Sequence, residues 1–349
     1  MAEWIHTDKG WRYKQEKVHL LRAQWHDYHA PTIYMLTLTT VNREPMFGRL
    51  IGDVDNAEID LTPVGKMVSE EIEQIPQYKG FESTEIFRYV VMPDHIHILL
   101  YVRKTIKHPL GYYVSWFKKQ CSDKGSALAA NSASTPTYIF APEYHDRILT
   151  HEGQLDNLRQ YIEDNPRRLV IKLANPDLFR LHQNLSYAGL DFSGLGNLFL
   201  LDYPLKQVLQ CSRTLSQEQI DSLKQQCLIK ADCGTVFISA GVSEGEKQIC
   251  RALRESGYPL IILLKDGFPA PADPNSKYFK PKGVYFETCA EGRLLLLEPK
   301  PEAFERPDII QTVNHKHPHL PHNISRYRFL ALNAMADILH AYQGFCSRG

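Results

Sequence analysis

Apolar side chains recur with two different spacings along the first half of the chain. One group of segments is rich in β-branched and aromatic residues, which predicts β-strands. These segments are residues 33–40, 87–92, 95–102 and 141–149. A second group repeats apolar side chains every three or four residues, which predicts helices. These segments are residues 61–75, 110–121 and 151–166, and the last is expected to stop near Pro166.

The predicted order is therefore strand, helix, strand, strand, helix, strand, helix. This βαββαβ plan gives a four-stranded antiparallel sheet with two helices on one face, an α+β architecture of the ferredoxin-like kind. One further helix remains at its C-terminal end. Residues 1–30 show no clear period and are expected to form an irregular arm, whereas residues 42–55 and 126–135 are expected to be loops.

After residue 181 strands and helices alternate, which predicts a parallel α/β sheet. The expected elements are strands at 208–211, 236–239 and 260–264, helices at 216–228 and up to 256, and a glycine-bearing loop at 189–196. The turn at 240–245 contains two glycines and joins a strand to a helix, as in a phosphate-binding Rossmann-type sheet. The motif is weak, because G-x-G-x-x-G and a Walker lysine are absent. We place the domains at 1–185 and 186–349.

Composition excludes several protein classes. No apolar run approaches the roughly 18 residues of a membrane-spanning helix, and the N-terminus lacks a secretory signal, so a cytoplasmic protein without a membrane partner is expected. Seven cysteines without a Cys-x-x-Cys motif argue against a disulfide framework or a structural zinc site. Forty basic and forty acidic residues cancel, so any nucleic-acid contact must come from a local patch.

His95 and His97 open an apolar strand directly after the Pro93-Asp94 turn. Side chains alternate along a strand, so the two imidazoles point the same way, roughly 6–7 Å apart. They can share a divalent cation if a third ligand arrives from elsewhere. The alternative is a pair of partly exposed histidines at a strand end.

Tyr161 and Asn165 are four residues apart on the last predicted helix of the first half, and are therefore neighbours on one helical face. Pro166 pushes Asn165 away from helical geometry, which weakens this prediction. Taken alone, Tyr161 reads as an ordinary tyrosine of an amphipathic helix.

Four separated blocks of the sequence resemble motifs of one known protein family. They are Met92-Pro93-Asp94-His95-Ile96-His97-Ile98-Leu99-Leu100, Phe117-Lys118, Tyr144-His145-Asp146-Arg147-Ile148-Leu149 and Tyr161-Ile162-Glu163-Asp164-Asn165-Pro166. In this order they resemble the single-tyrosine HUH transposases, in particular the REP-associated tyrosine transposases and their IS200-type relatives. The resemblance covers residues 33–180.

The resemblance implies a ferredoxin-like HUH domain with a catalytic C-terminal helix. It assigns His95 and His97 as ligands of Mg²⁺ or Mn²⁺, Tyr161 as the nucleophile and Asn165 as the third ligand. The implied enzyme is a DNA transposase or nuclease that cleaves and rejoins single-stranded, hairpin-containing DNA through a 5′-phosphotyrosine. Whether Tyr161 acts with the metal of its own chain, or with that of a second copy in a homodimer, is left open.

A basic and aromatic segment, residues 103–119, is the candidate DNA-binding surface. Arg103, Lys118 and Lys119 are the expected phosphate contacts, and four aromatic side chains lie between them. The alternative is a solvated helix face whose aromatic side chains belong to the core.

The second half loosely resembles the DNA-processing (SMF) and LOG-type Rossmann domains. The matching pieces are Cys211-Ser212-Arg213, Ser239-Ala240-Gly241, Asp266-Gly267-Phe268 and Ser325-Arg326-Tyr327-Arg328. Two other functions stay open: a non-catalytic DNA-hairpin binder, and a nucleotide-binding protein acting through the second half. A loop at 315–322 with four histidines could bind metal, although an extended proline-punctuated loop is the favoured interpretation.

Overall fold

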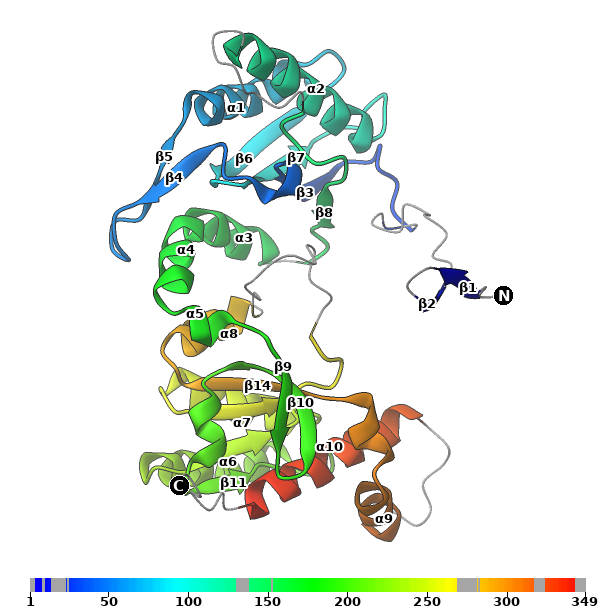
Figure 1. The fold of residues 1–349 in the computed structure, drawn as a ribbon, viewed down its shortest axis with the longest axis vertical. Coiled ribbons are helices and arrows are strands. Elements are labelled where there is room, and N and C mark those ends of the chain that lie inside the picture. The colour runs from blue at the N-terminus through cyan, green and yellow to red at the C-terminus, as the bar shows by residue number, and fades with distance from the viewer. Residues whose placement is uncertain are drawn as a thin grey trace. The chain divides into compact units, whose positions relative to one another are not determined.

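The computed structural model describes residues 4–7, 10–13, 23, 25–129, 138–151, 153–268, 281, 283–316 and 324–342. The chain divides into two compact units, Met1–Val170 and Ile171–Gly349 (Figure 1). Each unit has its own sheet and its own hydrophobic cores. Within the described part of the chain, none of the helices combines the length and the hydropathy that crossing a membrane requires.

The first unit is built on a four-stranded antiparallel sheet. Its strand order is β6-β7-β3-β8, which is the order that a βαββαβ chain adopts in a ferredoxin-like sheet. The strands are β3 (Thr32–Thr39), β6 (Thr84–Val91), β7 (His95–Val102) and β8 (His145–Ile148). The predicted ferredoxin-like topology of the first half is therefore present.

Helices cover both faces of this sheet. The helices α1 (Pro63–Gln74) and α2 (Leu110–Ala129) pack on the face that carries Leu36, Ile96 and Ile98. On the other face α3 (Gln154–Glu163) packs Leu158 and Ile162 against Met35 and Leu99. Because side chains alternate along β7, this second face also carries both histidines of the predicted site.

Two local predictions for the first unit were wrong. Residues 42–55 contain β4 (Gly48–Ile51), which pairs with β5 (Glu58–Leu61) as a separate hairpin. The helix α2 continues to Ala129, so residues 126–129 are helical, and the rest of that expected loop up to 135 lies outside the described residues. The predicted stop near Pro166 agrees with the structure, because α3 ends at Glu163. A separate helix that was not predicted, α4 (Asn165–Ala174), then begins, because a proline is tolerated in the first turn of a helix.

The remaining short elements of the first unit are the hairpin of β1 (Trp4–Thr7) and β2 (Gly10–Tyr13), and two 3-10 turns, η1 (Val41–Arg43) and η2 (Ile75–Gln77). The strand pair β1 and β2 lies within the region expected to be an irregular arm.

The second unit contains a six-stranded sheet in the order β11-β12-β13-β14-β10-β9. The strands β11 to β14 are parallel, whereas β10 and β9 are antiparallel to their neighbours. The strands are β9 (His182–Tyr187), β10 (Leu190–Gly196), β11 (Lys206–Val208), β12 (Val236–Ser239), β13 (Leu260–Leu263) and β14 (Leu294–Pro299). The expected loop at 189–196 is thus a strand, and the expected domain boundary after residue 185 falls inside β9.

Two layers of helices sandwich this sheet. One hydrophobic core combines side chains of α6 (Gln217–Asp232), α7 (Glu244–Glu255) and α8 (Gly283–Ala290) with one sheet face. The other core combines α9 (Pro307–Lys316) and α10 (Ile324–Ala341) with the opposite face. The short elements are α5 (Pro176–Phe179), η3 (Leu198–Asp202) and η4 (Pro301–Glu305).

The parallel strands of the second unit follow one another in chain order. A doubly wound Rossmann sheet instead reverses its strand order, and ligands bind at the crevice where the order changes. The four parallel strands β11 to β14 have no such reversal. The parallel α/β prediction therefore agrees with the structure, whereas the strand order departs from the expected Rossmann-type arrangement.

Candidate active site

The two histidines of the predicted metal site lie side by side on β7. Their ring centroids are 4.8 Å apart, with the rings inclined at 76°. His97 is buried and His95 is partly exposed. The antiparallel register pairs His97 with Thr37 and His95 with Thr39 of β3, so the central strands of the sheet fix both backbone positions.

Each imidazole is held through its Nδ1 atom. Nδ1 of His97 lies 2.8 Å from Oγ1 of Thr37, its cross-strand neighbour. Nδ1 of His95 lies 2.6 Å from Oδ1 of Asp94, and Arg43 pairs with the same carboxylate at 3.3 Å. Burial alone would raise the pKa of Asp94, but the hydrogen bond and charge of His95, together with Arg43, hold this pKa below its usual value.

Tyr161, the predicted nucleophile on α3, lies near His97. The centroid of its ring is 5.6 Å from that of His97, at an interplanar angle of 59°. The ring packs with the small core formed by Leu158 and Ile162, which fixes the rotation of α3. The guanidinium carbon of Arg168, a residue of α4, lies 5.4 Å from the centroid of the tyrosine ring.

Asn165 is buried at the junction between α3 and α4. Its Nδ2 donates a hydrogen bond of 2.7 Å to the carbonyl of Tyr161. This bond orients the amide so that Oδ1 is the atom available to accept or to ligate. Asp164, the residue before it, binds both Arg167 and Arg168 at 2.6 Å, and thereby connects the end of α3 to the cation beside the tyrosine.

The donor set suits a divalent cation. Two imidazole nitrogens and an amide oxygen are ligands that Mn²⁺ and other first-row metals accept in proteins. With Nδ1 of each ring held by Asp94 or Thr37, Nε2 is the nitrogen through which each ring would ligate, the arrangement typical of metal-binding histidines. Among the described residues no group of three or more His, Cys, Asp or Glu side chains is placed to hold a metal, and Asn165 as the third ligand stays a prediction.

Sequence reasoning missed three residues of this constellation, Thr37, Asp94 and Arg168. Thr37 has a signal in the sequence, because the predicted pairing of its strand with the histidine strand places it opposite His97. Asp94 was interpreted only as a turn residue, and Arg168 lies beyond the point where the helix was expected to end.

Lys118, one of the predicted phosphate contacts, is bound within the protein. Its ammonium donates hydrogen bonds to the carbonyls of Ala141, Pro142 and Glu143, at 2.8, 3.1 and 2.9 Å. An ammonium has three N–H donors, so these bonds use all of them. Lys118 therefore ties α2 to the segment that leads into β8, and its role is structural.

We expect Lys118→Met to lower the free energy of unfolding by about 1–3 kcal/mol, because three carbonyl groups lose a charged partner. Lys119→Met is the matched control, since Lys119 is exposed and pairs with Asp123 on its own helix, and we expect a change within about 0.5 kcal/mol. Urea unfolding of both variants measures the difference. Equal stability of the two variants would contradict the structural role.

The other two predicted DNA contacts lie on the surface. Lys119 is exposed, and Arg103 pairs with Glu85 across neighbouring strands. The aromatic side chains of α2 divide into two groups: Tyr113 and Phe117 belong to the core, whereas Tyr112 and Trp116 are exposed, at 51% and 44%. The core interpretation therefore holds for Tyr113 and Phe117, whereas DNA binding by the exposed face of the helix stays a prediction.

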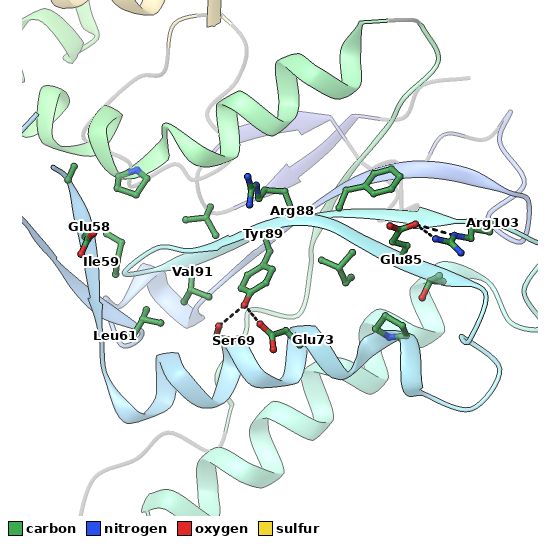
Figure 2. A pocket seen from close by; sticks show the side chains of 17 residues that line it. Glu58, Ile59, Leu61, Ser69, Glu73, Glu85, Arg88, Tyr89, Val91 and Arg103 are labelled. Carbon is green, nitrogen blue, oxygen red and sulfur yellow. Dashed lines mark hydrogen bonds and ion pairs between the residues drawn. The ribbon is translucent and has the colours of Figure 1, made fainter. Parts of the chain in front are cut away.

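A groove of about 960 Å³ runs along the edge strand β6 of the first unit. Figure 2 shows its lining, with Tyr89 pointing toward Ser69 and Glu73 of α1, and Glu85 pairing with Arg103. None of the predicted catalytic residues lines it. Its carboxylates and its paired arginines give no excess of positive charge, so the groove does not provide a basic track for DNA.

The expected phosphate position in the second unit is filled by a side chain of the protein. Glu246, in the first turn of α7, is buried, and its carboxylate accepts hydrogen bonds from the N–H groups of Val242 at 2.7 Å and Cys211 at 3.2 Å. Ser239 donates a further, longer bond of 3.5 Å. The carboxylate thus accepts from the N–H of Val242, one of the backbone donors that a phosphate at this turn would use.

We expect Glu246→Ala to destabilise the second unit by about 2–4 kcal/mol, because two buried N–H groups and a hydroxyl lose their acceptor. Glu246→Gln keeps one acceptor oxygen and should cost less. Thermal unfolding of the two variants tests this order, and an Ala variant as stable as the natural chain would show that the carboxylate is dispensable.

Comparisons with known proteins concern less than half of the chain. No family model matches it. An uncharacterised protein of Haemophilus influenzae is 22% identical over 161 residues, which are 42% of this chain and 86% of that protein. Among solved structures, a REP-associated tyrosine transposase bound to a REP hairpin is 17% identical over 42% of this chain and 73% of its own, with a TM-score of 0.29. A candidate transposase from Deinococcus radiodurans is 20% identical over 41% of this chain and 95% of its own, with a TM-score of 0.27.

Proposed function

We propose that the first unit is a single-tyrosine HUH strand transferase that cleaves and rejoins single-stranded, hairpin-containing DNA. One observation carries the proposal: the Tyr161 ring lies 5.6 Å from the ring of His97, which itself lies 4.8 Å from that of His95. A phenol and two imidazoles from separate elements thus converge at one place. We infer the reaction type from the four sequence blocks that resemble the single-tyrosine HUH transposases.

In this proposal the Tyr161 hydroxyl attacks the phosphorus of a phosphodiester in line with the leaving oxygen. The new bond joins Tyr161 Oη to phosphorus, and the bond from phosphorus to the 3′-oxygen breaks. The phenol loses its proton, and the leaving 3′-oxygen gains one to become a hydroxyl. The products are a 5′-phosphotyrosine and a free 3′-hydroxyl. A 3′-hydroxyl of a second strand can attack the phosphotyrosine in turn, which rejoins DNA without ATP.

A tyrosine must be activated for this attack, because the neutral phenol is a weak nucleophile. Its ordinary pKa near 10 leaves only about one molecule in a thousand ionised at neutral pH. His95, His97 and Asn165 would hold a Mg²⁺ or Mn²⁺ ion, which when bound polarises the phosphate and stabilises charge on its oxygens. Asp94 and Thr37 fix the two imidazole rings. Arg168 lies against the tyrosine ring, where its charge orients the ring and favours a developing negative charge on the phenol.

The test is a denaturant-resistant protein–DNA adduct. The full-length chain is incubated with a single-stranded oligonucleotide that forms a hairpin, with Mg²⁺ or Mn²⁺, and is then resolved by denaturing electrophoresis. A slower-migrating band that nuclease treatment removes is the expected result. A protein that binds the hairpin without forming this band would be the non-catalytic DNA-hairpin binder.

A further inference from the structure

The groove of the first unit follows the free edge of its sheet. In the described part of the chain, β6 pairs with one strand only, β7. All eight residues of β6 line the groove, although successive side chains of a strand point to opposite faces of the sheet. A groove that touches both faces of one strand lies along its edge. It therefore borders the N–H and C=O groups of β6 that point away from β7.

These outer backbone groups are suited to pairing with another strand. Among the described residues, no backbone hydrogen bond outside the β6–β7 ladder involves residues 85–91. The register with β7 shifts between Ile86 and Arg88 and is regular from Arg88 to Val91. Exposed edges are commonly covered or blunted in native sheets, because they present unpaired donors and acceptors. This edge instead faces a groove of about 960 Å³.

Two other elements supply side chains to the same end of the groove (Figure 2). Ser69 and Glu73 of α1 contact the hydroxyl of Tyr89, at 3.0 and 2.6 Å. Leu61 of β5 packs against the core that contains Val91. The regular half of β6 is therefore bordered by a polar group beside Tyr89 and by an apolar group beside Val91.

The charge that stays unpaired in the groove is negative. Its two arginines, Arg88 and Arg103, already form ion pairs with glutamates. Glu58 and Glu73 also line the groove, are exposed, and form no ion pair within the described part of the chain. Unpaired carboxylates repel phosphate and attract a lysine or an arginine. The groove therefore favours a cationic ligand over a nucleic acid.

The order of side chains along β6 sets the pattern of the ligand. Tyr89 and Val91 are two residues apart, so both point to the face that packs toward α1. In an added strand, a side chain opposite Tyr89 lies near Glu73, and the side chain two residues away lies near Val91 and Leu61. A basic residue separated by one position from an apolar residue fits this face.

We propose that the groove binds an extended basic segment of a partner protein, which adds to the sheet as a strand beside Arg88–Val91. Main-chain hydrogen bonds supply affinity in this mode, and alternate side chains supply specificity. A second copy of the chain fits less well, because pairing through β6 would bring the same unpaired carboxylates together. The site is separate from His95, His97 and Tyr161, none of which lines the groove.

The probe is a fluorescein-labelled heptapeptide, Thr-Val-Thr-Lys-Thr-Val-Thr, whose sequence reads the same in both directions and so fits a parallel or an antiparallel strand. Fluorescence polarisation with the full-length chain should show saturable binding with a Kd below about 1 mM. Two further peptides carry backbone N-methyl groups, one on Val, Lys and Val, the other on the two inner Thr residues. Successive N–H groups of a strand point to opposite edges, so one methylation pattern should abolish binding and the other should leave it nearly unchanged.

The carboxylate is tested with Glu73→Gln, which we expect to weaken binding of the lysine peptide about fivefold, as for a partly exposed ion pair. A peptide with Met in place of Lys should bind this variant and the natural chain equally. Glu70→Gln is the matched control, because Glu70 is exposed on the same helix and does not line the groove. It should leave the affinity for both peptides unchanged.

Absence of binding at about 1 mM peptide, equal effects of the two methylation patterns, or an equal loss in the Glu70 control would overturn the proposal. Sedimentation of the free chain as a dimer that the peptide dissociates would overturn it in favour of a second copy. Displacement of the peptide by a hairpin oligonucleotide would overturn it in favour of nucleic acid. The result is independent of the proposed transferase chemistry, since the Glu73 variant should still form the covalent adduct.

Discussion

Replacing Tyr161 by Phe is expected to abolish the covalent adduct with hairpin DNA. The variant keeps the ring that packs with Leu158 and Ile162 and faces His97, so the fold and the metal ligands remain in place. It lacks only the oxygen that would bond to phosphorus. Loss of a nucleophile reduces rates by several orders of magnitude, and we expect adduct below about one thousandth of the natural level, measured by denaturing electrophoresis.

Tyr144→Phe is the matched control for this experiment. Tyr144 precedes β8 in the same unit, is buried, and comes from the third block of the resemblance. We expect the Tyr144 variant to form the adduct at the natural level. If the adduct persisted in the Tyr161 variant and disappeared in the Tyr144 variant, the nucleophile would be Tyr144, and the assignment of α3 as the catalytic helix would be wrong.

The second large effect is expected from replacing the two predicted metal ligands, His95 and His97. Replacing His95 and His97 by Ala together should remove metal-dependent cleavage while leaving hairpin binding measurable, because no contact with DNA is assigned to either ring. We expect adduct formation to become independent of added Mg²⁺ or Mn²⁺ and to fall at least about 1,000-fold, since the cation supplies several kcal/mol of charge stabilisation. Isothermal titration with Mn²⁺ measures the loss of metal binding without relying on activity.

His315→Ala is the control for the histidine experiment. His315 is exposed in the last turn of α9 and belongs to the second histidine-rich segment of the sequence; its partners at 317, 319 and 322 lie outside the described residues. We expect Mn²⁺ binding and adduct formation to stay unchanged in this variant. Full metal-dependent activity without His95 and His97 would mean that the cation is held elsewhere.

The sequence predicts the centre of the first unit well, because local pattern and tertiary packing agree there. The strand β7 begins at the residue expected, and its alternation places His95 and His97 on the face opposite to the core that contains Ile96. The same alternation, combined with the pairing of β3 and β7, places Thr37 beside His97. Periodicity also predicts the helix that positions Tyr161.

In other parts of the chain, tertiary contacts determine structural features that the local sequence pattern does not predict. The predicted helix ends just before Pro166, but local pattern did not predict the next helix, α4, which accommodates this proline in its first turn. Lys118 is interpreted from the sequence as a surface cation, and only the approach of residues 141–143 gives its ammonium three carbonyl partners. The glycine turn at 240–245 resembles a phosphate loop, yet Glu246 accepts a hydrogen bond from the N–H of Val242 and Ser239 accepts one from the N–H of Gly241. Such outcomes depend on side chains that meet across long stretches of sequence, which no local spacing encodes.

The most direct test of the central claim is peptide mass spectrometry of the covalent adduct. After reaction with hairpin DNA and Mn²⁺, nuclease digestion and proteolysis, we predict a single modified peptide that carries a 5′-linked nucleotide on Tyr161. Modification of any other residue, or an adduct that releases a 5′-hydroxyl strand because the link is to a 3′-phosphate, would contradict the proposed transferase.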